Sequence, residues 1–185
     1  MIKTLQNIDW NIIKQAALTT KGLRPKSKVT SEWKAKALLS EHSMLYFSDI
    51  ILEVEMQYKT AMHLVRHNKT AGFYMLVQSQ RPDWTGKPRD AEVIVKTIIK
   101  ANPKALIEIS KTRLCYNAAE HTRTTWERIL QHINQTEPEI YSACKPNCIY
   151  REQCTEFHSC GWYDKTWFDK RRNDECIKGC SNRGK

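Results

Sequence analysis

The feature that most constrains the fold is an apolar stripe that runs from Pro103 to about Ile133. Its members recur three or four residues apart, or at sums of these spacings, as one face of an α-helix requires. The members are Leu106, Ile109, Tyr116, Ala119, Trp126, Leu130 and Ile133. Pro103 stands where the first turn of a helix tolerates proline. The pattern therefore predicts one long helix with one side in a hydrophobic core.

Two segments upstream of this helix have the composition of β-strands. The stretch "DIILEVEM" alternates apolar with more polar positions, which is typical of a strand with one buried face; its apolar residues are Ile50, Leu52, Val54 and Met56. The stretch "GFYMLVQ" is aromatic and β-branched and favours a second strand, with a helix as the alternative. Shorter helices are predicted over residues 31–44, with Ser31 as the N-cap, and after an N-cap at Thr60. Together these elements predict an α+β fold, in which a small antiparallel sheet packs against the long helix and a cysteine-rich C-terminal segment follows.

The length of 185 residues suits one main domain that buries a core without disulfides. We predict that this domain spans residues 1–137 and that residues 138–185 form a cysteine-rich tail. Lys and Arg number 30 against 20 Asp and Glu, so the formal net charge is +10. This excess favours anionic partners such as nucleotides, nucleic acid or phosphorylated cofactors, while a solvated basic surface is the alternative.

Targeting and membrane signals are not evident in the sequence. The N-terminal residues show neither the compact apolar region nor the small-residue cleavage site of a signal peptide. No run approaches the roughly 18 apolar residues that a membrane-spanning helix needs. We therefore expect a cytoplasmic protein with no membrane partner.

Six of the seven cysteines lie after residue 143. Four of them, Cys144, Cys148, Cys154 and Cys160, have the spacing C-x3-C-x5-C-x5-C. In a reducing compartment such crowding predicts a structural zinc site or an iron–sulfur cluster held by these four thiolates, with reduced structural cysteines as the alternative. Cys115 falls within the predicted long helix and is expected to be a small core residue.

Three arginines adjoin apolar segments: Arg66, Arg81 and Arg113. A guanidinium on the apolar side of a helix costs several kcal/mol to desolvate unless an anion or a hydrogen-bonding partner meets it. The partner of Arg113 is either an internal carboxylate such as Glu108 or a bound ligand. Three such arginines in one small domain raise the odds of a shared anionic ligand, but ordinary ion pairs and snorkelling side chains are the more common explanation of such a pattern.

Common catalytic motifs are missing from the chain. It has no nucleophile elbow, no glycine-rich phosphate loop and no dinucleotide fingerprint. If the protein is an enzyme, arginines hold its phosphates and a cofactor supplies its chemistry. His63 and His67 lie four apart on one helical face, and we expect them to pack or to contact a ligand.

In the segments that carry these arginines and histidines, the chain resembles the flavin-dependent thymidylate synthases. That family has Arg-His-Arg, a spacer of seven and then Ser, and here "RHNKTAGFYMLVQSQR" gives Arg66, His67, Asn68, a spacer of ten, Ser79 and Arg81. The segment "TRLCYNAAEHTR" is similar to the family's second element, and "LLSEHSMLYF" to its Ser/His segment. The likeness covers about residues 35–160 and is greatest to short, phage-type members with a cysteine-rich tail.

The resemblance implies methylation of dUMP at C5, with methylenetetrahydrofolate as carbon donor and a hydride from FAD that NADPH has reduced. It implies that four residues bind FAD, namely Arg66, His67, Asn68 and His42. It implies that four others bind dUMP, namely Ser79, Arg81, Gln78 and Arg123, with Arg81 on the phosphate. Arg113 would bond the pyrimidine ring and stabilise the charge that develops there. A homotetramer with active sites between subunits is also implied.

The chain departs from the family pattern at three positions. Asn68 replaces the third motif arginine, Val77 stands two residues before Ser79, and Glu108 stands five before Arg113. A changed substrate and a catalytically inactive nucleotide-binding relative therefore remain open. A nucleic-acid-binding module with a zinc-stapled basic tail is the third alternative.

Overall fold

The computed structural model describes residues 1–67, 71–75 and 91–163. Four of the predicted site residues lie outside these ranges: Asn68, Gln78, Ser79 and Arg81. The part of the tail after residue 163 also lies outside them.

A four-stranded antiparallel sheet forms one layer of the molecule. Its strands are β1 (Ile2–Gln6), β2 (Ile50–Gln57), β3 (Ala71–Met75) and β4 (Ile94–Ala101), in the order β1-β2-β4-β3. The predicted alternation in β2 is confirmed, because Ile50, Leu52, Val54 and Met56 are all buried. Val95 and Ile99 of β4 point to the same side. The predicted second strand is also present as β3, although the later residues of "GFYMLVQ" lie outside the described ranges.

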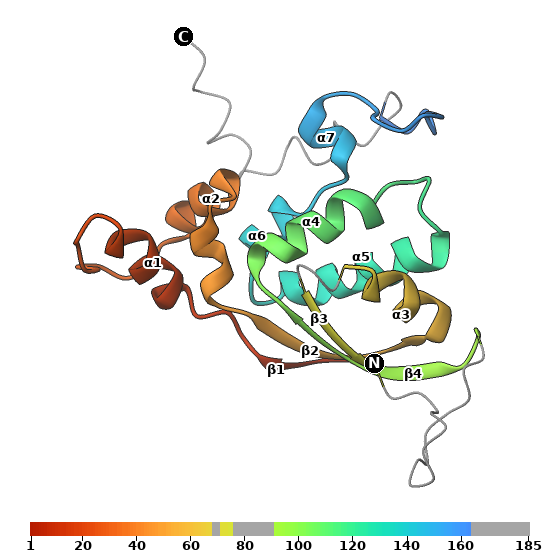
Figure 1. Cartoon of the computed structure of the whole chain (residues 1–185), viewed down its shortest axis with the longest axis horizontal. Helices are drawn as coiled ribbons and strands as arrows, with labels where there is room; N and C mark the ends of the chain where they lie inside the picture. The colour runs from red at the N-terminus through yellow and green to blue at the C-terminus, as the bar shows by residue number, and fades with distance from the viewer. Residues whose placement is uncertain (68–70, 76–90, 164–185) are drawn as a thin grey trace, which may run out of the picture.

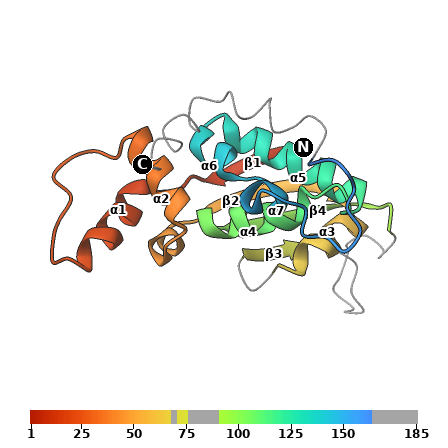
Figure 2. The same cartoon turned by 90° about the horizontal axis from the view of Figure 1, so that it is seen from above.

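Helices cover the buried face of the sheet, as Figure 1 shows. They are α1 (Trp10–Thr19), α2 (Ser31–Ser40), the 3-10 helix η1 (Ser43–Phe47), α3 (Tyr58–Val65), α4 (Pro103–Arg113), α5 (Glu120–Asn134), α6 (Pro138–Ala143) and α7 (Asn147–Arg151). In Figure 2, α4 and α5 lie side by side over the sheet, while α1 and α2 stand at one end of it. The helix α7 lies on α4, on the side away from the sheet. The α+β fold with a small antiparallel sheet is therefore confirmed.

The single long helix predicted from the apolar stripe is wrong. The helix α4 ends at Arg113, the chain reverses, and α5 begins at Glu120 and runs back beside α4 (Figure 1). Trp126 on α5 is fully buried, and its indole Nε1 donates to the Ser110 hydroxyl on α4 at 2.9 Å. Tyr116, a member of the stripe, is 44% exposed in the turn. The hairpin buries the apolar sides of both helices in one core. A continuous helix of that length would extend about 45 Å, so part of its apolar side would project beyond the sheet into solvent.

Two predicted helix caps are also corrected. Thr30, not Ser31, caps α2, since its extended backbone lets its hydroxyl accept from the backbone N–H of Trp33 at 3.2 Å. Thr60 is buried inside α3, whose N-cap is Gln57. In both cases the helix begins before the residue that the sequence pattern favours.

The start of the predicted tail packs into the main core. Ile140 and Cys144 are fully buried in the same hydrophobic cluster as Trp126. The boundary between residues 137 and 138 stays a prediction. Within the described ranges, no helix has both the length and the apolar character needed to cross a membrane. The cytoplasmic location also stays a prediction.

Candidate functional site

Six basic side chains gather where three helices meet at one end of the molecule. The C-terminal end of α3, the C-terminal end of α4 and the N-terminal end of α5 come together there (Figure 1). We call the following residues the basic cluster: His63, Arg66, His67, Arg113, His121 and Arg123. The reversal between α4 and α5 creates this site, because it returns His121 to His63, whose backbone carbonyl bonds Arg113.

Arg113 is held by two contacts, neither of them with a carboxylate. Its Nε donates to Nε2 of His67 at 2.9 Å, and its Nη2 donates to the backbone carbonyl of His63 at 2.8 Å. Glu108, the internal partner considered for it, accepts instead from Lys111 at 2.8 Å. Among the residues that the structure describes, no ion pair involves any arginine. The positive charge of Arg113 is therefore left available for a ligand.

The surroundings of His63 and His67 favour the neutral form of both side chains. Burial lowers the pKa of His67, and the charge of Arg113 lowers it further. Burial likewise lowers the pKa of His63, with His121, Arg113 and Arg66 adding to the effect. A neutral His67 whose Nε2 accepts from Arg113 carries its proton on Nδ1. Burial and the neighbouring Arg66 also lower the pKa of Arg113, although a guanidinium keeps its charge at physiological pH.

A second contact joins α3 to the start of α5. Nδ1 of His63 lies 2.8 Å from the hydroxyl of the buried Thr122, and the rings of His63 and His121 have centroids 5.2 Å apart. These contacts fix the orientation of His63. The side chain of His63 is therefore a positioning group between α3 and α5.

Two buried nitrogen atoms of the cluster lack hydrogen-bond partners in the described structure. They are Nε2 of His121 and Nε of Arg123. Leaving a buried polar atom unsatisfied costs about 1–3 kcal/mol, so native proteins seldom tolerate it without a bound group. The adjoining N-terminus of α5 has no side-chain cap at Ala119, and helix N-termini favour negative charge. The arrangement suits an anionic ligand with several acceptor oxygens.

A stack of side chains connects the basic cluster to the C-terminal segment. The guanidinium of Arg123 lies 4.2 Å from the ring centroid of Tyr116. The ring of Tyr116 in turn stacks on Trp162 at 4.9 Å with an interplanar angle of 29°. Sequence reasoning did not predict the contact of Trp162 with this region, because the two segments are distant along the chain.

The structure brings together some of the predicted site residues and separates others. Arg66, His67, Arg113 and Arg123 all belong to the basic cluster. His42, predicted beside them, is exposed at the start of η1, and no hydrogen bond in the described ranges joins it to the cluster. His121 was not predicted as a site residue. Its position two residues before Arg123, in the first turn of an amphipathic helix, was the available signal.

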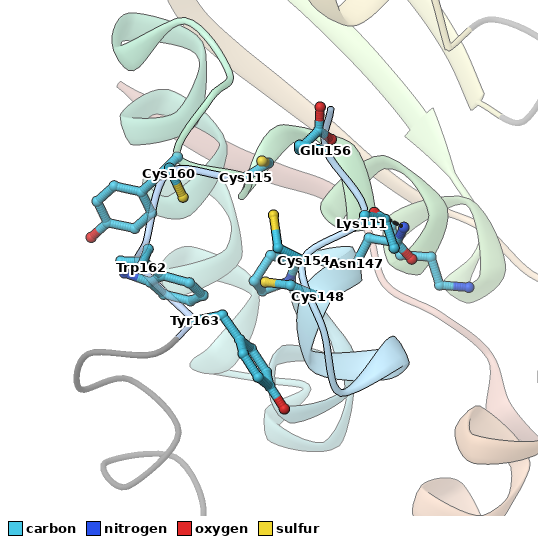
Figure 3. Close-up of a pocket in the computed structure, with 12 residues that line it drawn as sticks. Lys111, Cys115, Asn147, Cys148, Cys154, Glu156, Cys160, Trp162 and Tyr163 are labelled. Atoms are coloured by element: carbon cyan, nitrogen blue, oxygen red, sulfur yellow. Dashed lines mark hydrogen bonds between the residues drawn. The ribbon is translucent and has the colours of Figure 1, made fainter. Parts of the chain in front are cut away.

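Cysteines from three segments line one cavity of about 20 Å³. Figure 3 shows Cys115, Cys148, Cys154 and Cys160 around this space, which we call the cysteine cavity. Cys115 is not the helical core residue that was predicted, because it lies in the turn after α4. Cys144 does not line the cavity and is fully buried in the hydrophobic core.

Two thiols of this cavity, those of Cys115 and Cys148, have raised pKa values and favour the protonated form. Burial, with a smaller contribution from nearby Cys115 and Cys154, raises the pKa of Cys148 to about 11. Burial also raises the pKa of Cys115. Within the described ranges, no three His, Cys, Asp or Glu side chains already stand in a metal-binding arrangement.

Comparison with known proteins identifies the fold. No family model and no curated protein matches the chain. Among solved structures, the UMP/dUMP methylase PolB from Streptomyces cacaoi bound with 5-Br dUMP is similar, with a TM-score of 0.56 and 13% sequence identity over 77% of this chain and 93% of that chain. The same methylase bound with 5-Br UMP gives a TM-score of 0.55 at 13% identity over 77% of this chain and 92% of that chain. This chain therefore has the fold of a UMP/dUMP methylase.

Proposed function

We propose that this protein is a flavin-dependent methylase that converts dUMP, or a closely related deoxyuridylate, to its C5-methyl product. The observation that carries the proposal is the basic cluster, whose arginines have no carboxylate partner in the described structure and whose His121 and Arg123 each bury an unsatisfied nitrogen. The fold shared with a methylase bound to 5-Br dUMP and the sequence resemblance to flavin-dependent thymidylate synthases support it.

The donor set of the basic cluster fits the phosphorylated ligands that the proposal requires. Both dUMP and FAD present phosphate oxygens, which accept several hydrogen bonds at once, and unpaired guanidinium and imidazole N–H groups are suitable donors. FAD, when bound and reduced by NADPH, supplies the hydride that completes the methyl group from methylenetetrahydrofolate. Arg66 and His67 would hold the cofactor, and Arg123 would hold the nucleotide. Asn68, Gln78, Ser79 and Arg81 keep their predicted roles from the sequence resemblance.

Arg113 would act on the pyrimidine ring. A guanidinium has five N–H donors, and the contacts with His67 and the His63 carbonyl occupy Nε and one donor of Nη2. The remaining donors can bond a ring carbonyl without losing either contact. Because these two contacts fix the side chain before the ligand arrives, its charge is already positioned where negative charge develops on the ring. The resemblance also leads us to propose a homotetramer with sites between subunits.

The first experiment measures cofactor binding and product formation with the full chain. Purified protein is titrated with FAD by flavin fluorescence and then given dUMP labelled with tritium at C5, methylenetetrahydrofolate and NADPH. We expect FAD binding, tritium release to water and formation of dTMP. Binding of FAD and dUMP without tritium release would instead identify an inactive nucleotide-binding relative. Failure to bind FAD, together with a salt-dependent shift of a DNA duplex, would favour the nucleic-acid-binding alternative.

A further inference from the structure

The cysteine cavity is formed by residues that lie far apart in the sequence. Cys115 comes from the turn between α4 and α5, Cys148 from α7, and Cys154 and Cys160 from the segment that follows α7. Figure 3 shows these four side chains around a common space. The proposed methylation does not use this cavity.

Contacts on both sides hold the cysteine-bearing segment against the turn. The side-chain amide of Asn117 donates to the backbone carbonyl of His158 at 2.7 Å. The amide of Asn147 donates to the hydroxyl of Thr155 at 3.0 Å. The stacking of Tyr116 on Trp162 adds a third contact. The four cysteines are therefore neighbours because of the fold as well as their spacing.

We propose that Cys115, Cys148, Cys154 and Cys160 bind one Zn²⁺ ion as a tetrahedral four-thiolate site. This ligand set differs from the one suggested by the spacing, because Cys115 replaces Cys144. The cavity of about 20 Å³ is large enough for a single ion, and four thiolates are a usual ligand set of a structural zinc site. Each Zn–S bond forms as an S–H group gives its proton to water, and no electron is transferred.

Zinc would draw the four sulfur atoms closer than they stand in the described structure. Tetrahedral coordination at about 2.3 Å places neighbouring sulfurs about 3.8 Å apart, and no three metal-ligating side chains of the described ranges are yet arranged to hold an ion. The required movement is confined to side chains and to the segment bearing Cys154 and Cys160, most of which is exposed. Cys144 is excluded because it is fully buried in the hydrophobic core and does not line the cavity.

The site would fasten the C-terminal segment to the turn that separates the two halves of the basic cluster. Arg113 ends α4 just before Cys115, and Arg123 lies in α5 just after the turn. A tail of this composition has few aliphatic residues, so metal binding would add to the stability that its contacts with the turn provide. The inference does not depend on the proposed reaction, since zinc binding is measured without substrate.

The test uses the full chain, purified with a reductant that does not bind metal. Zinc is measured by elemental analysis, and Co²⁺ is then substituted to detect the absorption bands of tetrahedral thiolate coordination. We expect about one Zn²⁺ per chain in the wild type and in the matched variant Cys144→Ala. In Cys115→Ser we expect the zinc affinity to fall at least 10-fold, because loss of a residue that only hydrogen-bonds a metal ligand already lowers affinity by about that factor. The affinity is measured by competition with a chromophoric chelator.

A second measurement on the wild type covers the case in which Cys115→Ser fails to fold. Alkylation followed by mass spectrometry should show that zinc protects Cys115 and that chelation exposes it, while the labelling of Cys144 does not change with zinc. Three results would overturn the proposal. The first is a wild type that holds no zinc and shows no thiolate band with Co²⁺, and the second is iron–sulfur absorption in place of zinc. The third is loss of zinc from Cys144→Ala, together with a zinc-bound wild type in which Cys115 is still alkylated.

Discussion

Arg113 combines a half-buried position with hydrogen bonds to two uncharged acceptors, Nε2 of His67 and the carbonyl of His63. A structural arginine in such a place would normally be paired with a carboxylate, because desolvating an unpaired cation is costly. The nearby Glu108 is already bonded to Lys111. At the scale of the residue, Arg113 is a half-buried cation whose charge no carboxylate of the described residues neutralises.

We predict that Arg113→Ala lowers kcat for tritium release from C5-labelled dUMP by about 100-fold or more, which is typical of losing a pre-positioned charge. The kcat of Arg113→Lys should stay close to that of Arg113→Ala, because an ammonium cannot reproduce the planar donor geometry of a guanidinium. Arg128→Ala, on the exposed side of α5, is the matched control and should retain wild-type turnover. Wild-type kcat in Arg113→Ala would remove this residue from the mechanism.

The lowered pKa values of His63 and His67 predict how the free energy of unfolding depends on pH. Their folded pKa values are lowered by burial and by neighbouring cations, so below about pH 6.5 the unfolded chain binds more protons than the folded one. Their contribution to stability is therefore complete above about pH 6.5 and is lost as the pH falls through the folded pKa values.

Urea unfolding between pH 8 and pH 5 measures this dependence. The free energy of unfolding of the wild type should fall more steeply below pH 6.5 than that of His67→Gln, whose amide oxygen can still accept from Arg113. His42→Gln, at an exposed histidine, serves as the control and should follow the wild-type curve. Identical curves for all three proteins would contradict the assignment of a neutral His67.

At the scale of elements, the α4–α5 hairpin is the feature that creates the site. Its apolar stripe was read correctly as helical, but periodicity does not distinguish one long helix from two that fold back on each other. The hydroxyl of Ser110 accepts from the indole of Trp126 and donates to the carbonyl of Leu106 at 2.7 Å. This buried pair fixes the alignment of α5 along α4.

We predict that Ser110→Ala lowers the free energy of unfolding by about 1–3 kcal/mol, because it leaves the buried N–H of Trp126 without an acceptor. Thr124→Ala, which removes an exposed hydroxyl from α5, should change the same quantity by no more than about 0.5 kcal/mol. Chemical denaturation monitored by circular dichroism makes the comparison. Equal effects of the two substitutions would show that the buried pair does not hold the hairpin together.

At the scale of the whole molecule, a buried polar network joins the N-terminal helices to α6. Lys34 on α2 donates to Glu137 at 2.8 Å and lies 3.7 Å from Glu139, and the indole of Trp10 also donates to Glu137 at 2.7 Å. Both carboxylates are buried. Removal of the lysine would leave two negative charges in a poorly solvated site.

We predict that Lys34→Met lowers the free energy of unfolding by about 3–5 kcal/mol, the usual cost of removing one partner from a buried ion pair. Lys36→Met is the matched control on the same helix, because its pair with Glu32 is exposed and such pairs contribute little to stability. Thermal and urea unfolding of both variants give the result. A loss for Lys34→Met no larger than for Lys36→Met would mean that α6 is held by its apolar contacts alone.

The sequence by itself determined the local structure and most of the residue types of the site. Alternating apolar residues identified β2, helical periodicity identified the region of α4 and α5, and arginines beside apolar segments marked Arg66 and Arg113 as ligand-binding candidates. The strand and the helical character of this region are confirmed, because they depend on backbone periodicity over a few neighbouring residues. The ligand-binding roles of Arg66 and Arg113 stay predictions.

Only the tertiary structure decided which distant residues meet. The chain reversal after Arg113 brought His121 into the basic cluster and placed Cys115, instead of the core residue Cys144, beside the cysteines of the tail. A turn of this kind is selected by the burial of two helix faces in one core, which is a property of the packed molecule. Residue spacing carries no information about that choice, since the same stripe fits a straight helix and a hairpin equally well.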